Sequence, residues 1–161
     1  MPVTPGSRER IDILVCLGGK RYPIEFKHLT QDFDIEHAGE RFKQKFGYVH
    51  SIDAHACVKD IQRVESWAAR HADCGYGFAV WLANDSFWWN SRPHPSAKYI
   101  DFSIHDGAVK FGAMEGIVNG EQEKISLRGE YAIQWRFYSD LGASNGLFKY
   151  VLLQIHNKQH G

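Results

Sequence analysis

Two carboxylates and one ammonium group fall at positions where one strand pair can bring them together. Asp12 opens a short apolar run, and Glu25 and Lys27 are charged positions in a second run that follows a Gly-Gly pair. Adjacent glycines supply the positive φ of a tight turn, so the two runs are predicted to form a β-hairpin. Because side chains alternate across a strand, Glu25 and Lys27 would share one face, and Asp12 could join them from the neighbouring strand.

Such a group of side chains can support metal-assisted hydrolysis of a phosphodiester bond. Carboxylate oxygens suit hard cations, so Asp12 and Glu25 would hold Mg²⁺ or Mn²⁺, with the main-chain carbonyl of Phe26 as a further ligand. Lys27 would position water or stabilise the developing negative charge. Alternating charges are also typical of a hairpin with one solvated face, and the spacing leaves that alternative open.

The same residues carry a resemblance to a known family. Asp12, followed thirteen positions later by Glu25-Phe26-Lys27 within apolar strand residues, resembles the signature of the PD-(D/E)XK nuclease superfamily. The resemblance implies a restriction-endonuclease-like mixed β-sheet core, a Mg-dependent endonuclease activity, DNA as the substrate, and Asp12, Glu25 and Lys27 as the catalytic residues. The chain departs from the pattern because Ile11, not Pro, precedes Asp12, and because residues 1–10 are too short for the helix that usually opens such cores.

A second resemblance spans most of the chain but brings no established activity. Four segments look similar to a group of uncharacterised bacterial proteins that share the Glu-x-Lys strand: Asn84-Asp85, Gly129-x-Tyr131, Trp135-x-x-Tyr138-Ser139 and Phe148-x-Tyr150.

Composition predicts one globular, β-rich domain. The chain has 161 residues, of which 43% are hydrophobic and 14% aromatic. We expect residues 1–10 to be a flexible lead-in and residues 11–161 to form a single nuclease-like α/β domain. Apolar runs are too short to cross a bilayer and no signal peptide is recognisable, so we expect a cytoplasmic protein without a membrane partner. The three cysteines show no close pairing or zinc-site spacing, which favours reduced thiols.

A second strand pair is predicted directly after the first. Residues 33–35 and 41–46 alternate around a turn at Ala38-Gly39, and Arg41, Lys43 and Lys45 would share one strand face. Beside the proposed metal, these cations would contact a phosphate backbone. Strand-borne cations also commonly keep an edge soluble and unpaired, which is the alternative.

One helix is predicted from Asp53 to Asp73, with Asp53 or Ser51 at its start and Cys74-Gly75 at its end. Its buried stripe consists of apolar residues at helical spacing: Cys57, Val58, Ile61, Val64, Trp67 and Ala68. Asp60 and Arg63 are three apart and could pair. The superfamily resemblance suggests that this helix leans over the site, so that Gln62 and Arg63 would face it and Arg63 would contact nucleic acid.

Tyr76–Ala83 is an uninterrupted apolar run, which predicts a strand covered on both faces and, with the preceding helix, an α/β sandwich. The aromatic residues Phe87, Trp88 and Trp89 follow a short turn at residues 84–86. They would close one end of the core, or alternatively stack on an unpaired base.

The C-terminal part is predicted to be β-rich. Strand residues 100–104 and 109–113 would form a hairpin around Asp106-Gly107, and residues 116–124 would form a polar loop. One long strand would run from Ile125 to Phe137, and a last strand, apolar on both faces, from Phe148 to Ile155.

Two functions of different classes remain. The first is the metal-dependent nuclease. The second is a non-catalytic nucleic-acid-binding or assembly module on the same fold, because a fold does not determine a function. The zero net charge of the chain favours the second and the intact Asp12, Glu25 and Lys27 set favours the first. A homodimer is compatible with either.

Overall fold

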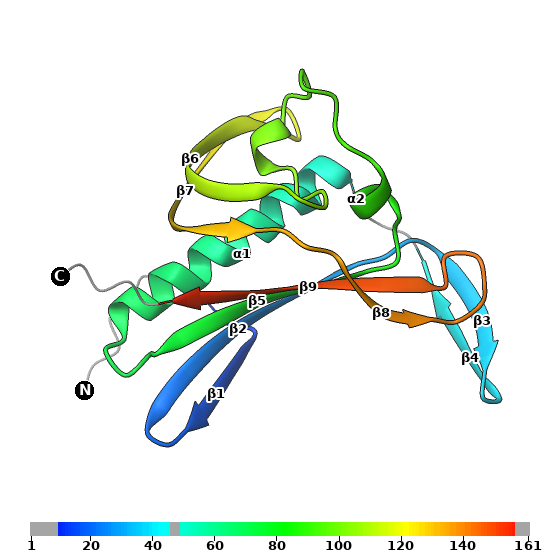
Figure 1. Ribbon diagram of the computed structural model, residues 1–161, viewed down its shortest axis with the longest axis horizontal. Helices are drawn as coiled ribbons and strands as arrows, with labels where there is room; N and C mark the ends of the chain where they lie inside the picture. Colours follow the sequence, from blue (N-terminus) through cyan, green and yellow to red (C-terminus); the bar gives the residue numbers. More distant parts are fainter. Residues whose placement is uncertain (1–9, 46–48, 157–161) are drawn as a thin grey trace.

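The computed structural model describes residues 10–45 and 49–156, which form a mixed α/β structure made mostly of strands with one main helix (Figure 1). The predicted lead-in therefore lies outside the described residues, apart from Arg10. A five-stranded sheet has the order β1-β2-β5-β9-β8, and two hairpins stand apart from it, β3-β4 and β6-β7. The elements are β1 (Ile13–Leu17), β2 (Lys20–Leu29), β3 (Phe33–His37), β4 (Glu40–Gln44), α1 (His50–Arg70), β5 (Tyr76–Ala83), α2 (Phe87–Asn90), the 3₁₀ helix η1 (Ile100–Phe102), β6 (Val109–Val118), β7 (Glu121–Ala132), β8 (Arg136–Asp140) and β9 (Leu147–His156).

Both predicted N-terminal hairpins are confirmed, but the last strand of the second one ends at Gln44 and does not include Lys45; residue 46 lies outside the described residues. Gly18 and Gly19 have φ values of +57° and +73°, and β1 pairs antiparallel with β2 from Ile13 opposite Ile24 to the turn. The β3-β4 turn likewise uses positive φ, at Ala38 and Gly39. Only β2 and β5 run parallel, because α1 lies between them in the chain and returns it to the same end of the sheet.

Helix α1 has the predicted buried stripe but different ends. It begins at His50, three residues before Asp53, and its N-cap Val49 makes no side-chain capping bond. It ends at Arg70 rather than near Cys74-Gly75, because His71 leaves the helical conformation and its Nδ1 donates to the Trp67 carbonyl at 2.7 Å. The His71 ring also stacks on Trp67, which satisfies the helix end without glycine.

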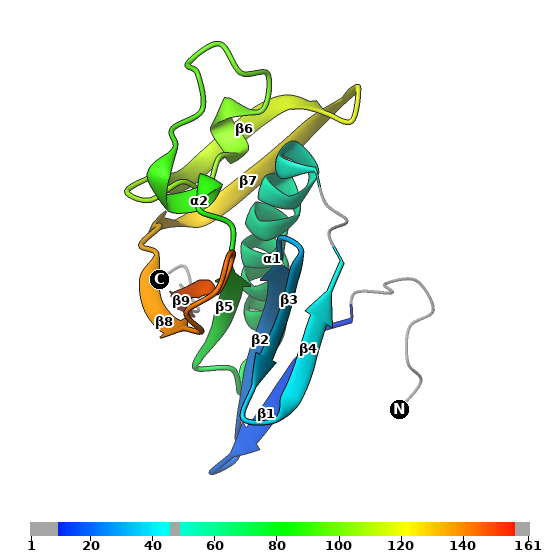
Figure 2. The same cartoon turned by 90° about the vertical axis from the view of Figure 1, so that its right-hand side faces the viewer.

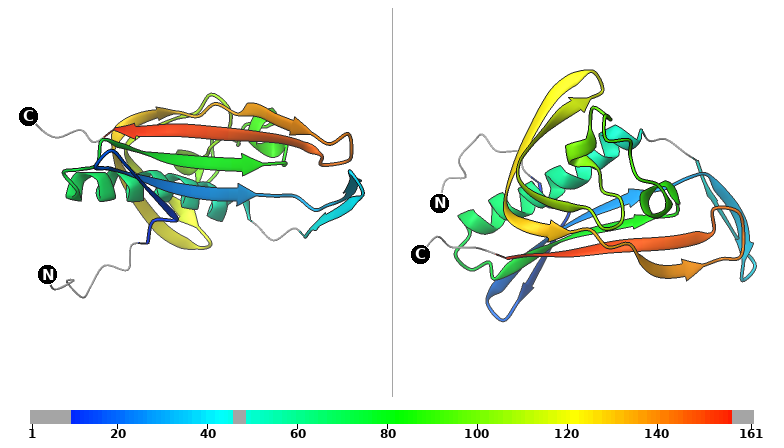
Figure 3. Two further views of the ribbon diagram at one scale, coloured as in Figure 1. Left: turned by 90° about the horizontal axis from the view of Figure 1, so that it is seen from below. Right: turned by 45° about the horizontal axis from the view of Figure 1, so that its top comes forward.

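The bounds predicted for β5 are confirmed, but coverage of both its faces is not. Its buried positions alternate with half-buried ones, and the buried set includes Gly77 and Ala79. Helix α1, α2 and the β6-β7 hairpin all lie on one side of the five-stranded sheet (Figure 1). In the view from below, the strands of this sheet are in front of them (Figure 3, left). The sandwich is therefore closed on one face of the sheet only.

The C-terminal predictions need three corrections. Residues 100–102 form a 3₁₀ helix instead of a hairpin strand, because Phe102, Ser103 and Ile104 are all buried and present no alternating face. Residues 116–124 are the β6-β7 hairpin, not a loop, since Asn119 and Gly120 take the positive φ values of a two-residue turn.

The predicted long strand is instead two strands in different sheets. The chain leaves β7 at Ala132 and enters β8 at Arg136. Between them Trp135 is held by Asp106, whose Oδ1 accepts its backbone N–H at 2.8 Å, and by the Ile104 carbonyl, which accepts its indole N–H at 2.8 Å. These bonds turn the chain from one sheet to the other. The last strand, β9, is confirmed, but it is not covered on both faces, because buried and exposed residues alternate from Val151 to His156.

The main buried cluster joins α1 to the five-stranded sheet and to the β6-β7 hairpin. Glu65 is part of this junction: its buried carboxylate accepts the backbone N–H groups of Arg128 and Gly129 and the hydroxyl of Tyr131. Trp88 is 1% exposed, so it closes the core and is not available for base stacking. All three cysteines are free thiols, and none of the described helices is long and apolar enough to cross a membrane.

The close approach of α1 to the sheet at Gly77 can be tested. A Cβ there would lie 2.4 Å from Val64 Cγ1 and 2.8 Å from the Pro23 carbonyl oxygen. We expect Gly77→Ala to lower the free energy of unfolding by about 2 kcal/mol, as over-packing does, measured by urea denaturation. Gly75→Ala is the matched control, because its Cβ meets nothing within 4 Å; equal effects at the two positions would contradict the close packing.

Candidate active site

Glu25 and Lys27 face α1, not solvent. Strand alternation places them on the inner face of β2, with Phe26 on the outer face. Glu25 is 1% exposed, and the Lys27 side chain is 26% exposed. The alternative of a solvated charged face is therefore wrong for Glu25, whose burial requires charged or hydrogen-bonding partners.

The Glu25 carboxylate has one satisfied oxygen. Its Oε2 accepts a hydrogen bond from Arg63 Nη1 at 2.9 Å, whereas its Oε1 is buried without a hydrogen-bond partner among the described residues. Burial raises the pKa of Glu25 to about 7, against the attraction of the Arg63 guanidinium, and the neighbouring Asp12 raises it further. Glu25 is thus a carboxylate near its titration point at neutral pH, with one oxygen free to accept a ligand.

Lys27 is held by a residue that the sequence did not single out for the site. Its Nζ lies 3.3 Å from Oδ2 of Asp60, which is 1% exposed. Arg63 Nη2 lies 3.3 Å from the other Asp60 oxygen, which confirms the expected pairing of Asp60 with Arg63. Burial raises the pKa of Asp60 and the two cations oppose that rise. The four side chains form an alternating network that we call the inner charge network: Glu25, Arg63, Asp60 and Lys27.

Asp12 approaches this network from the edge of the sheet. The β1 ladder ends at Ile13, and Asp12 Oδ2 accepts the Phe26 backbone N–H at 3.0 Å in place of a further strand residue. The N–H and C=O of one strand residue point to the same edge, so the Phe26 carbonyl faces the side on which Asp12 lies. Asp12 is exposed while Glu25 is buried, which makes this edge the solvent boundary of the network.

The remaining predicted residues divide into two groups. Arg63 does face the site, where its guanidinium binds Glu25 and Asp60, whereas Gln62 donates to the Ser126 carbonyl on β7. The predicted cations of the second hairpin, Arg41, Lys43 and Lys45, are elsewhere. The β3-β4 hairpin stands beyond the C-terminal end of β2 (Figures 1 and 3), so it lies in front of β2 in Figure 2.

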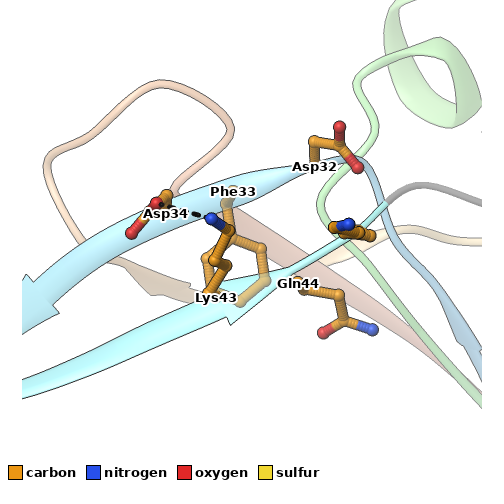
Figure 4. Close-up of a pocket in the computed structure, with 6 residues that line it drawn as sticks. Asp32, Phe33, Asp34, Lys43 and Gln44 are labelled. Atoms are coloured by element: carbon orange, nitrogen blue, oxygen red, sulfur yellow. Dashed lines mark ion pairs between the residues drawn. The ribbon is translucent and has the colours of Figure 1, made fainter.

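The β4 cations are engaged within their own hairpin. Arg41 Nε and Lys43 Nζ lie 2.7 and 3.7 Å from the two carboxylate oxygens of Asp34. Lys43 and Lys45 line a small hollow with Asp32, Asp34 and neighbouring residues (Figure 4). They are not beside Asp12 and Glu25. The prediction that these cations lie next to the candidate metal ligands is therefore wrong.

The sequence analysis gave two acidic residues of α1 a helical role only and did not place them near the site. Asp60 lies three positions after Cys57 and four before Val64, which places it within the buried stripe. Asp53 lies four positions before Cys57; its Oδ2 is buried without a hydrogen-bond partner in the described chain, and burial raises its pKa. Carboxylates at core positions of a helix were the available signal, since an acidic residue is rarely buried unpaired.

No family model matches this chain, and no curated protein or solved structure is significantly similar to it.

A divalent metal fits this site in a limited way. Within residues 10–45 and 49–156, no group of three or more His, Cys, Asp or Glu side chains is placed to hold a metal ion. Mg²⁺, however, is commonly bound through one or two carboxylates and keeps several waters. The free Glu25 Oε1, the exposed Asp12 and the Phe26 carbonyl are compatible with that kind of binding.

The titration of Glu25 gives a pH test of the site. The folded pKa of about 7 is above the ordinary value of 4.5, so the folded state binds the proton more tightly. The resulting stabilisation is complete below about pH 4.5 and is lost as the pH rises to about 7. Relative to Glu25→Gln, the native chain should lose up to about 3 kcal/mol of unfolding free energy over that window and then level off.

Chemical denaturation at each pH measures this difference. Asp34→Asn is the contrasting variant: Arg41 lowers the pKa of Asp34, so the contribution of Asp34 is lost only on acidification below its ordinary value of 3.8. A difference between the native chain and Glu25→Gln that stays constant from pH 4.5 to 7 would contradict the buried, protonatable Glu25.

Proposed function

We propose that this chain is a metal-dependent nuclease of the PD-(D/E)XK type that hydrolyses phosphodiester bonds in DNA. Asp12 and Glu25 would hold Mg²⁺ or Mn²⁺, with the Phe26 carbonyl as a third ligand. The observation that carries the proposal is the buried Glu25 carboxylate, which keeps one oxygen free beside Asp12 and shares its strand face with Lys27.

The arrangement of strands supports the restriction-endonuclease-like assignment within the proposal. The Glu-x-Lys strand β2 is the second strand of a hairpin, α1 follows and packs on its inner face, and β5 returns parallel to β2. The site lies where the β1 ladder stops and the edge of β2 becomes accessible. A mixed β-sheet core is what the family resemblance implies.

The protein groups have separate roles in this proposal. The bound metal would lower the pKa of a coordinated water and neutralise charge on the phosphate. Arg63 keeps Glu25 oriented and favours its ionised form. Asp60 holds the Lys27 ammonium in the network, from which Lys27 would act on the attacking water or on the developing oxyanion. Asp60 and Arg63 are thus positioning residues.

A non-catalytic nucleic-acid-binding or assembly module is the second candidate. It is favoured by the lack of a third metal-ligating side chain among the described residues and by the pairing of Arg41 and Lys43 with Asp34. In such a module the inner charge network would only fix α1 on the sheet. The two candidates differ in whether a divalent cation binds at Asp12 and Glu25.

Calorimetric titration with Mg²⁺ and Mn²⁺ at pH 8 tests the proposal, because Glu25 is then ionised. We expect the native chain to bind, and Asp12→Asn and Glu25→Gln each to weaken binding by at least about tenfold. Asp34→Asn is the matched control and should bind as the native chain does. No binding by the folded native chain would remove the nuclease proposal and favour the non-catalytic module.

A cleavage assay separates the roles of the metal ligands and Lys27. Lys27→Met retains the aliphatic stem, so we expect metal binding to persist while Mg²⁺-dependent cleavage of DNA falls by about a hundredfold or more. Lys124→Met is the control, since Lys124 is an exposed cation paired with Glu115 on the β6-β7 hairpin. Retention of full cleavage by Lys27→Met would exclude Lys27 from the mechanism.

A further inference from the structure

The five-stranded sheet has an apolar face that nothing in the described chain covers. Register places the outward side chains of the three central strands together, since Ile24, Phe78 and Gln154 are opposite one another, as are Phe26, Val80 and Leu152. Helix α1 packs on the other face. We call this surface the outer sheet face; from β2, β5 and β9 it contains Tyr22, Ile24, Phe26, His28, Tyr76, Phe78, Val80, Leu82, Tyr150, Leu152, Gln154 and His156.

The chemistry of this face is that of an interface. None of those twelve residues is Asp, Glu, Lys or Arg: seven have aromatic or histidine rings, four are aliphatic and the twelfth is Gln154. Leu152 is 47% exposed, and on the adjoining strand β8 Phe137 and Tyr138 are 64% and 63% exposed. Phe137 and Tyr138 line a hollow of about 570 Å³ together with Phe26, Val80, Leu82 and Tyr150.

We propose that two copies of this chain form a homodimer by packing their outer sheet faces together. Strand β5 favours a stable interface. Its unbroken apolar sequence is typical of a strand buried on both faces, and within a single copy only one of its faces is buried. A second copy supplies an apolar surface of the same shape and composition. The chain has zero net charge, so charge repulsion does not oppose self-association.

The area is adequate for a stable dimer. Five strands about 4.8 Å apart, with a mean length of about eight residues of about 3.3 Å each, give a flat footprint of roughly 600 Å². Side-chain relief increases the accessible area, which brings it to the order of the ~800 Å² per partner that specific dimers bury. Packed sheets lie about 10 Å apart, so Phe137 and Tyr138 of one copy can enter the hollow of the other across a twofold axis.

The charge distribution argues against nucleic acid as the occupant. Aromatic platforms that stack bases also carry cations that follow the phosphate backbone. Here the nearest cations by register are Lys20, at the β1-β2 turn, and Arg136, on the edge strand β8. The centre of the face therefore has aromatic rings without a phosphate partner, which suits another apolar sheet.

Dimerisation would leave the candidate active site accessible. Glu25 and Lys27 point to the α1 side of β2, whereas Phe26 between them points to the outer sheet face. Two packed copies would thus carry their sites away from the common interface. The proposal does not depend on nuclease activity, and its test needs no substrate.

Sedimentation velocity of the full chain from about 1 to 100 µM is the first measurement, and we expect a dimer that dissociates on dilution. Leu152→Glu and Phe137→Glu should be monomers at every concentration, because each places a charge within the buried face. Val109→Glu and Phe111→Glu are matched controls on the separate β6-β7 sheet, where Val109 and Phe111 are 45% and 59% exposed. Both controls should remain dimers.

Circular dichroism and a cooperative thermal transition establish that each variant is folded. Phe137 lies on an edge strand and is mostly exposed, so its substitution tests the interface even if Leu152→Glu fails to fold. A native chain that stays monomeric at 100 µM would overturn the proposal, as would dimers that persist in the folded Phe137→Glu variant. If the native chain is a monomer that binds single-stranded DNA and Phe137→Glu does not bind it, the outer sheet face is a nucleic-acid surface instead.

Discussion

The inner charge network between β2 and α1 is the interaction on which the site depends. Glu25 and Asp60 are each 1% exposed, and two buried carboxylates are tolerable only because Arg63 and Lys27 lie between them. The network fixes the rotation of α1, since Asp60 and Arg63 are one helical turn apart and must both face β2. It also leaves Glu25 Oε1 without a hydrogen bond among the described residues, which is unfavourable for folding alone. An unsatisfied buried carboxylate next to an open sheet edge is more typical of a binding site than of a structural ion pair.

The rest of the fold supports this geometry from one side. Gly77 and Ala79 on β5 give α1 room to approach the sheet, and Glu65 ties the same helix to β7. The helix is therefore held at three places: the inner charge network, the small residues of β5 and the backbone of Arg128 and Gly129 on β7. The opposite face of the sheet has no such support within one chain. The proposed dimer interface is this apolar face, whereas the proposed chemistry takes place at the exposed edge near Asp12. The two proposals therefore concern different surfaces.

Most of the local elements could be predicted from the amino-acid sequence. The Gly-Gly turn requires positive φ, so it defined the first hairpin and placed Glu25 and Lys27 on one strand face. The helical spacing of Cys57, Ile61, Val64 and Ala68 identified α1, and the unbroken apolar run identified β5. The Asn119-Gly120 turn carried an equally local signal that was missed. These features depend on residues within a few positions of one another, which is why they can be inferred from the chain alone.

The pairing of charged side chains, by contrast, depends on how distant elements pack together. Lys27 and Asp60 are 33 positions apart, and their contact depends on how α1 packs on β2. The same packing buried Glu25, raised its pKa and selected Arg63 instead of Gln62 as its partner. Arg41 and Lys43 were correctly predicted to lie on a strand. The β3-β4 hairpin is separate from the main sheet, however, and both cations form ion pairs with Asp34 within it. Whether a charged strand face meets solvent, a helix or its own hairpin depends on long-range packing, and residue spacing carries no information about that.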